Sequence, residues 1–204
     1  MQCLDLNTDN NRESLILSFP MLAHDPQFVV TSKETPIYNC IAWAMGFTDR
    51  WVDVVDRTDI DVRSGNFTWW PSGVEQSFRP KALKEAFEAV GFEVCESSDY
   101  EADYDKSVLY CMNGIWTHAS RILSDVEEHS KFGESWNAHH GRNKFSGSIY
   151  GEPFCCMRRN HSLKQIFLSK FPLKIGTITI NKDKVKPLIN LLRVKMGLPP
   201  TPNI

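Results

Sequence analysis

The sequence predicts an α+β domain in which two short helices precede an antiparallel sheet. The chain has 204 residues, of which 42% are hydrophobic and 24% charged. This length and composition allow one substantial core plus an extension. Helical patterns occupy residues 37–46 and 80–90, whereas strand patterns fill residues 107–159. Because helical and strand segments are segregated along the chain, the α+β class is favoured over an alternating βα arrangement.

Both helices have terminal residues that mark where they begin and end. In the first helix, Asn39 is the expected N-cap and Gly46 the C′ residue, which puts Cys40 in the first turn. In the second, Pro80 suits the first helical position and Gly91 ends the helix. Its predicted buried stripe consists of Leu83, Ala86, Phe87 and Val90.

The sheet is predicted from strand patterns separated by turn residues. The Asn113-Gly114 pair between two apolar runs is typical of a two-residue type I′ hairpin. Ser124-Asp125 is expected to form the next turn. Residues 51–76 have no sustained period and are predicted to form a long structured loop. The expected strands cover residues 92–96, 107–112, 115–123, 126–132, 135–140 and 151–159.

Charge divides the chain into a body and an extension. Residues 157–204 hold 10 of the 23 basic side chains and one acidic side chain, Asp183. We therefore predict a poorly ordered lead-in over residues 1–13, one domain over 14–159 and a basic extension over 160–204, with a strand at 174–180 and a helix at 187–196. The extension either packs on the acidic body, forms a solvated face or binds an anionic partner such as nucleic acid.

Cysteine usage and apolar runs bear on location. Six irregularly spaced cysteines, and first residues without the pattern of a signal peptide, favour a reducing compartment. The longest apolar runs, residues 15–19 and 108–112, are far shorter than the roughly 20 residues that span a bilayer. The expectation is a cytoplasmic protein without a membrane segment, and delivery as an effector stays open.

Cys40 is the candidate nucleophile. In the first turn of a helix, unpaired backbone N–H groups and the helix dipole favour the thiolate and lower the thiol pKa. Cys40 is the only cysteine with this predicted placement. The alternative for Cys40 is a small buried side chain, and this is the expectation for the other cysteines.

His118 is the candidate base because the strand over residues 115–123 would hold it rigidly. Trp116 and Ser120 are its expected neighbours on the same strand face, and a core histidine is the alternative. His129, His139 and His140 on the following strands are secondary candidates for the base. A tight turn at Ser124-Asp125 would bring residues 130–131 opposite His118. Ser130 is thus the first choice for the group that orients the imidazole, with Glu134 and His139 as alternatives.

Several motifs carry a resemblance to known proteins. These are residues 36–46 (PIYNCIAWAMG), 69–71 (WWP), 86–95 (AFEAVGFEVC), 117–121 (THASR), 130–133 (SKFG) and 150–151 (YG), followed by Arg158. From about Phe19 to Arg159 the chain resembles a family of small, largely uncharacterised bacterial domains. A cysteine at a helix start, followed by a second helix and a sheet with a histidine, also resembles the papain-like fold of the NlpC/P60 cysteine hydrolases.

This resemblance implies a thiol-dependent hydrolase or acyltransferase acting on an amide, peptide or isopeptide bond. Cys40 matches the nucleophile and His118 the base, and no cofactor is required. Predicted substrate contacts are Tyr38, Asn39, Trp43, Trp70 and Trp116, although the tryptophans also suit a core. The alternative is a catalytically inert papain-like module that binds protein or nucleic acid through its basic extension.

A metal site is not expected. The available ligands include neighbouring pairs that project poorly toward one tetrahedral centre, and the sequence has no C-x₂-C pair. The acidic run between residues 53 and 61 lacks the glycine and terminal glutamate of a calcium loop. The candidate zinc ligands are His139, His140, Cys155, Cys156 and His161.

Overall fold

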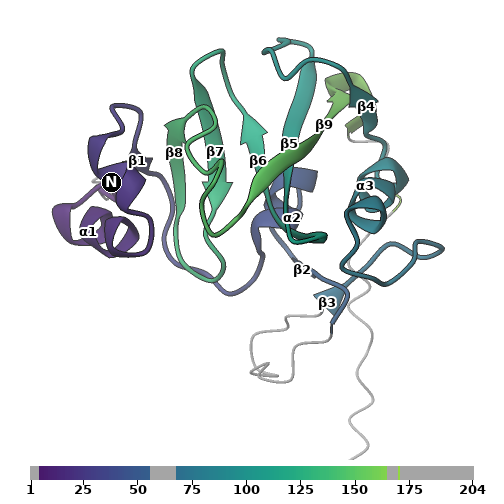
Figure 1. The fold of residues 1–204 in the computed structure, drawn as a ribbon, viewed down its shortest axis with the longest axis horizontal. Coiled ribbons are helices and arrows are strands. Elements are labelled where there is room, and N and C mark those ends of the chain that lie inside the picture. Colours follow the sequence, from purple (N-terminus) through teal and green to yellow (C-terminus); the bar gives the residue numbers. More distant parts are fainter. Residues whose placement is uncertain (1–4, 56–67, 165–169, 171–204) are drawn as a thin grey trace, which may run out of the picture. The chain divides into compact units, whose positions relative to one another are not determined.

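The computed structural model describes residues 5–55, 68–164 and 170 of the chain. Figure 1 shows a central sheet with short helices around it, so the predicted α+β class is confirmed. The strand and helix predicted at 174–180 and 187–196 lie outside the described residues. The elements are α1 (Asp9–Ser18), η1 (Pro20–His24), β1 (Val29–Val30), α2 (Cys40–Met45), β2 (Trp51–Val52), β3 (Thr68–Trp69), α3 (Pro80–Ala89), β4 (Glu93–Cys95), β5 (Tyr104–Met112), β6 (Ile115–Ile122), β7 (Glu127–Lys131), β8 (Asn137–Gly141) and β9 (Glu152–Asn160).

The main sheet has seven strands in the order β1-β8-β7-β6-β5-β9-β4, and every neighbouring pair is antiparallel. The hairpin between β5 and β6 is confirmed, since Asn113 has φ 54° and Gly114 φ 78°, both left-handed as a type I′ turn requires. β5 begins at Tyr104, three residues earlier than predicted. The last strand, β9, lies between β5 and the edge strand β4, so it is the second strand from one edge of the sheet.

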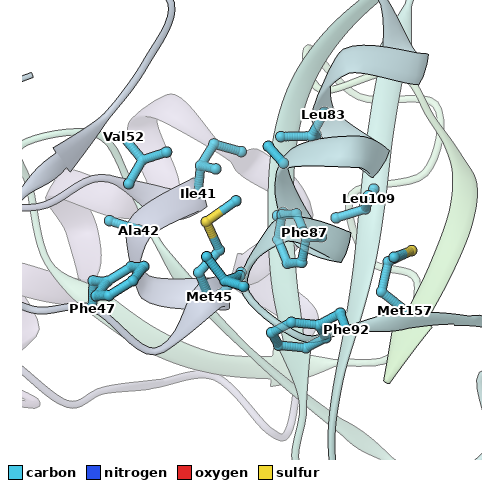
Figure 2. Close-up of a cluster of buried hydrophobic side chains, with 14 of the residues drawn as sticks. Ile41, Ala42, Met45, Phe47, Val52, Leu83, Phe87, Phe92, Leu109 and Met157 are labelled. Atoms are coloured by element: carbon cyan, nitrogen blue, oxygen red, sulfur yellow. The ribbon is translucent and has the colours of Figure 1, made fainter. Parts of the chain in front are cut away.

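One face of the sheet is covered by α2 and α3. Ile41 and Met45 of α2 and Leu83 and Phe87 of α3 are fully buried in one cluster with Leu109 of β5. Figure 2 shows these side chains gathered between the two helices and the strands. The spacing of Leu83 and Phe87, one helical turn apart, is the stripe that the sequence predicted. Both helices keep their predicted ends, with Gly46 (φ 95°) and Gly91 (φ 92°) in left-handed conformations.

The opposite face of the sheet is covered by α1 and η1. Leu15, Phe19 and Leu22 are buried there with Tyr110 of β5 and Phe145. The predicted lead-in over residues 1–13 is therefore too long, because α1 begins at Asp9. The Oγ1 atom of Thr8 caps this helix by accepting the N–H of Asn11.

A register shift in β6 decides which side chains share a face. His118 pairs with Tyr110, whereas Trp116 pairs with Cys111, so Thr117 is an extra residue between the two pairs. Trp116 consequently joins the cluster under α2 and α3, while His118 lies among the aromatic rings of the other face. The expectation that Trp116 and His118 share a face is wrong because of this bulge.

Short strands form where the sequence predicted a loop or nothing. Trp51 and Val52 of β2 pair in parallel with Thr68 and Trp69 of β3, within the segment predicted as a loop. β1 pairs with β8 and was not predicted. Strands of two residues are too short to produce a detectable alternation of polar and apolar side chains.

The described helices are short. α1 and α3 have 10 residues each, and no helix within residues 5–55 and 68–164 is long and apolar enough to cross a membrane.

Candidate active site

Cys40 occupies the first position of α2, as predicted, because Asn39 caps this helix. The Asn39 Oδ1 atom accepts the N–H of Ala42 at 3.0 Å, and its Nδ2 atom donates to the carbonyl of Val52 at 2.8 Å. Asn39 is buried, and the hydrogen bonds of its side-chain amide fix the backbone around α2. We therefore assign Asn39 to positioning Cys40 rather than to the substrate contact predicted for it.

The Cys40 thiol is protonated at neutral pH. Burial raises its pKa to about 11, and the backbone N–H groups of Ala119 and Ile41, which point to the sulfur, offset this rise only in part. The expectation of a lowered pKa is wrong because desolvation of the anion outweighs the helix N-terminus here. The contact with Ala119 N–H also puts the Cys40 sulfur beside the residue that follows His118.

The imidazole of His118 is fully buried on the face of the sheet opposite α2 and α3. Its ring stacks on Tyr150 at a centroid distance of 3.9 Å and an interplanar angle of 6°. Phe132 and Phe145 pack against the same imidazole. Burial, and secondly the neighbouring His140, lower the pKa of His118 well below its usual value, so the ring is neutral at pH 7.

Three side chains form a buried network that fixes the proton positions on both histidines. The His140 Nδ1 atom lies 3.0 Å from the carbonyl oxygen of Gly141, which can only accept, so Nδ1 of His140 carries a proton. The other nitrogen of neutral His140, Nε2, then accepts the Ser130 hydroxyl proton at 2.8 Å. Ser130 Oγ in turn accepts from His118 Nε2 at 3.0 Å. His118 is thereby held with its proton on Nε2.

The lone pair of His118 is left on Nδ1. This atom is buried and has no hydrogen-bond partner among the described residues. No hydrogen bond joins it to the Cys40 thiol within those residues either, although the thiol contacts the neighbouring backbone N–H of Ala119. A buried acceptor without a hydrogen-bond partner lowers the stability of the fold. An imidazole that is nevertheless kept in this state suits the role of a proton acceptor.

The three residues predicted as candidates to orient the His118 imidazole lie in different places. Of the three predicted candidates, Ser130 is the one that is hydrogen-bonded to His118. His139 lies on the opposite face of the sheet, where it packs edge-on against His129 at 4.5 Å. Glu134 follows β7 in the connection to β8.

A buried carboxylate supports the far end of the network. Glu128 accepts from the hydroxyls of Tyr110 at 3.1 Å and Ser120 at 2.7 Å through Oε2. Arg142 Nε donates to the other oxygen, Oε1, at 3.1 Å. The charge of Glu128 favours the protonated form of His140, but burial acts more strongly, so the pKa of His140 is lowered.

Gly151 allows Tyr150 to stack on His118. A Cβ atom at Gly151, where φ is 74°, would lie 2.1 Å from the carbonyl oxygen of Cys111 in β5. The backbone therefore approaches β5 more closely than another residue would allow. The Thr117 hydroxyl also donates to the Tyr150 carbonyl, which ties the stacked ring to the bulge beside His118.

The aromatic residues predicted to contact substrate belong to two groups. Tyr38 stacks on Trp43 at 5.9 Å and donates to Asn137 Oδ1 at 3.0 Å. Trp70 stacks on Trp116 at 6.0 Å. Trp116 is only 6% exposed and is a core residue, whereas Tyr38, Trp43 and Trp70 are partly exposed.

Lys131, the residue after Ser130, stabilises the connection between β7 and β8. Its ammonium group is fully buried and donates to the carbonyls of Gly133, at 2.8 Å, and Ser135. It thus closes the connection between β7 and β8. Burial lowers its pKa to about 8, and the charge of Cys40 acts in the opposite sense, which places Lys131 within electrostatic reach of the thiol.

The described residues contain no group of three or more His, Cys, Asp or Glu side chains that could hold a metal ion. The ligands weighed for zinc are dispersed: His140 bonds to Ser130, and His161 lies 3.4 Å from Asp105.

Sequence reasoning ranked His140 and Tyr150 too low. Strand alternation contained a signal for His140, since it shares the parity of the buried Ala138 and lies diagonal to Ser130 across the β7–β8 pair. The position of Tyr150 on His118 depends on the close approach at Gly151, which no local pattern encodes.

Fold and site together define an α+β domain whose antiparallel sheet holds a buried serine–histidine network beside a cysteine at a helix start. The chain belongs to a family described as a domain of unknown function, DUF7689, whose profile matches residues 29–158. The match therefore runs from β1 into β9 and includes every residue of the network. No curated protein and no solved structure matches the chain.

Proposed function

We propose that the protein is a thiol-dependent hydrolase or acyltransferase of papain-like type that acts on an amide, peptide or isopeptide bond. The observation that supports this most is the tautomer of His118. The network through Ser130 and His140 keeps the His118 proton on Nε2 and leaves Nδ1 as an unpartnered base, while the Cys40 sulfur contacts the backbone N–H of the next residue, Ala119. A base oriented by a third group is the arrangement that a nucleophilic cysteine requires.

In the first step, the Cys40 sulfur attacks the substrate carbonyl carbon while its proton passes to His118 Nδ1. A proton transfer concerted with attack suits a thiol whose pKa is raised to about 11, because no free thiolate needs to accumulate. The tetrahedral intermediate collapses when the imidazolium returns this proton to the leaving amine. Water or an acceptor amine then attacks the Cys40 thioester, with His118 again accepting a proton.

The N-terminus of α2 supplies donors for the developing oxyanion. The backbone N–H groups of Cys40 and Ile41 face the sulfur and lie at the positive end of the helix. The charge of Lys131, fully buried and within electrostatic reach of Cys40, adds to the positive potential there.

The test is acyl transfer to Cys40 from a small activated ester. The full chain is mixed with p-nitrophenyl acetate at pH 7.5, and the acetylated cysteine is identified by peptide mass spectrometry. We expect acetylation of Cys40 ahead of the other five cysteines, and a loss of at least tenfold in its rate in His118→Gln, since general-base catalysis contributes about 10²–10⁴-fold.

His129→Gln is the matched control. His129 is also a buried histidine of the sheet, but it lies on the opposite face, where it bonds to Thr31 Oγ1 at 2.8 Å. Its substitution should leave acetylation of Cys40 unchanged. Equal rates in His118→Gln and the unsubstituted chain would contradict the proposed role of His118.

One observation favours a second candidate, the catalytically inert papain-like module. His118 is 0% exposed, and a base so enclosed also suits a purely structural network. This candidate predicts no preference for Cys40 among the acetylated cysteines. Its proposed binding surface is the basic extension, of which the structure describes residues 160–164 and 170; there, Lys164 lies 3.1 Å from Asp105 of the body.

The remaining proposals follow from the sequence. A peptide, protein or amide is the proposed substrate, an anionic molecule the proposed partner of the extension, and the cytoplasm the proposed location. Deleting residues 165–204 separates the two roles, because the hydrolase proposal expects acetylation of Cys40 to persist without them.

A further inference from the structure

Two cysteines face each other at one edge of the main sheet. Cys95 of β4 and Cys156 of β9 are direct partners in the antiparallel register, and their sulfur atoms lie 3.0 Å apart. Both are free thiols and both are partly exposed. They lie 61 positions apart in the sequence, so the fold and not the local sequence brings them together.

The backbone of this pair already has the geometry of a disulfide. Directly opposed residues of antiparallel strands have Cα atoms about 4.5–5.5 Å apart, and disulfides span Cα separations of about 4.4–6.8 Å. The sulfur atoms need to approach by about 1 Å to reach the bonded distance of about 2 Å. Rotation about the side-chain bonds provides this approach without movement of the strands.

The pair is accessible to a small reagent. Cys95 and Cys156 line an open pocket together with Glu96, Ser98 and Val108, and Cys155 also contributes to its lining. The pocket lies over the β4 edge of the sheet, where three-residue β4 is the outermost strand. A small disulfide in solution can therefore reach the thiols without unfolding the sheet.

We propose that Cys95 and Cys156 form a reversible disulfide, a site of modification by small-molecule disulfides such as oxidised glutathione. One thiolate of the pair attacks a sulfur of glutathione disulfide, and one glutathione thiolate leaves. The second protein thiolate attacks the resulting mixed disulfide and releases the other glutathione. One glutathione disulfide is reduced to two glutathione molecules, and the two protein thiols lose two protons and two electrons.

The raised pKa of Cys156 makes this exchange slow at neutral pH. Burial, and secondly the hydrogen bond and charge of Cys95, raise the pKa of Cys156, while the ammonium group of Lys106 acts in the opposite sense. The rate of disulfide formation should therefore rise with pH, because the thiolate is the attacking species.

Cys155 is a matched control within the same strand. It is adjacent to Cys156 and also partly exposed, but it points to the face covered by α3, where its sulfur lies 3.4 Å from Met157 Sδ. Strand alternation keeps it away from Cys95. Any oxidation that depends on exposure alone would involve Cys155 as readily as Cys156.

The test is oxidation of the full chain in mixtures of oxidised and reduced glutathione at pH 8, followed by peptide mass mapping without reduction. The expected product is a Cys95–Cys156 linked peptide in the unsubstituted chain and in Cys155→Ser. Cys156→Ser should give only a mixed disulfide at Cys95. A second readout is the melting temperature, which should rise by several degrees on oxidation of the unsubstituted chain and not of Cys156→Ser, because the bond closes a long loop.

Two results would overturn the proposal. One is a product in which Cys155 is linked, or in which Cys95 and Cys156 each carry glutathione without a bond between them. The other is an unmodified pair under conditions that oxidise Cys155. Neither result concerns Cys40, so the proposed hydrolase activity stands or fails separately.

Discussion

β7 and β8 present histidines to both faces of the sheet, and the two sets differ in how their nitrogen atoms are used. On the face covered by α1, Ser130 and His140 hold His118 in one tautomer and leave its Nδ1 without a partner. On the other face, His129 bonds to Thr31 at 2.8 Å and packs edge-on against His139. Ser130 and His140 thus support the candidate base of β6 on one face, while the residues adjacent to them, His129 and His139, form a structural pair on the other.

The difference teaches that strand parity, more than residue type, determines which histidine belongs to the site. His139 and His140 are adjacent, and a shift of one residue would exchange their faces. Burial lowers the pKa of both His129, to about 3, and His140, so burial alone does not separate the two sets. The hydrogen bonds that Ser130 makes to His118 and His140 distinguish the two sets.

The largest expected effect concerns Cys40, whose sulfur contacts the backbone N–H of Ala119, the residue after His118. With a pKa of about 11, its thiolate fraction at pH 7 is about 300-fold below that of a free thiol with a pKa of about 8.5. Alkylation by iodoacetamide should therefore be slow and rise tenfold per pH unit up to about pH 11. The measurement is the rate at Cys40 by mass spectrometry, with the denatured chain as control; a plateau below pH 8 would instead indicate a preformed thiolate–imidazolium pair.

The support of His118 can be broken at Gly151. Gly151→Ala should lower the free energy of unfolding by about 3 kcal/mol, because a positive φ and an overlap with the Cys111 carbonyl act together. Urea unfolding measures this change. Gly114→Ala is the control, since its φ is also positive but its Cβ would meet nothing within 4 Å; its cost should be about 1–2 kcal/mol.

Removing the Ser130 hydroxyl tests the difference between the histidines of the two faces directly. Ser130→Ala leaves His118 Nε2 and His140 Nε2 without their partner, so it should cost about 1–3 kcal/mol of stability. Acetylation of Cys40 should also slow, since the His118 proton is no longer fixed on Nε2. Parallel urea titrations and acetylation assays on His139→Ala provide the comparison. An equal loss of acetylation in both variants would contradict the distinction between the faces.

Acid should destabilise both sets alike. The pKa of His129 is about 3 in the folded chain and about 6.5 unfolded, so between these pH values the unfolded chain binds one more proton. The free energy of unfolding therefore falls as pH falls below 6.5, by up to about 1.4 kcal/mol per pH unit for this histidine. His118 and His140 act in the same direction.

The check is urea unfolding between pH 7 and pH 4. His129→Gln and His118→Gln should each reduce the slope of stability against pH. A slope unchanged by His129→Gln would show that this ring is protonated in the folded chain.

Much of the fold could be predicted from local signals. Asn39 and Gly46 delimit α2, and Asn113-Gly114 sets the β5–β6 hairpin, because capping and left-handed turns depend on a few adjacent residues. The bond between His118 and Ser130 was also predicted, although the register differs from the one expected for a tight turn at Ser124-Asp125: Arg121 pairs with His129, so Ser130 lies diagonal to His118. Such features need no knowledge of distant contacts.

The rest depended on contacts that are remote in sequence. The bulge at Thr117 reverses the face of Trp116, and no pattern in β6 announces it. The high pKa of Cys40 results from burial beneath other segments, which a helix N-terminus does not reveal. α1 was missed because Leu15 is its single fully buried side chain, so its sequence lacks an apolar stripe.

The sheet narrows toward both margins. Its outermost strands, β1 and β4, have two and three residues, whereas β5 and β9 inside it have nine each. A margin this short offers another chain few unpaired backbone groups on which to add a strand. The taper therefore discourages edge-to-edge aggregation through strand length, and in β4 the exposed charge of Glu93 acts in the same sense.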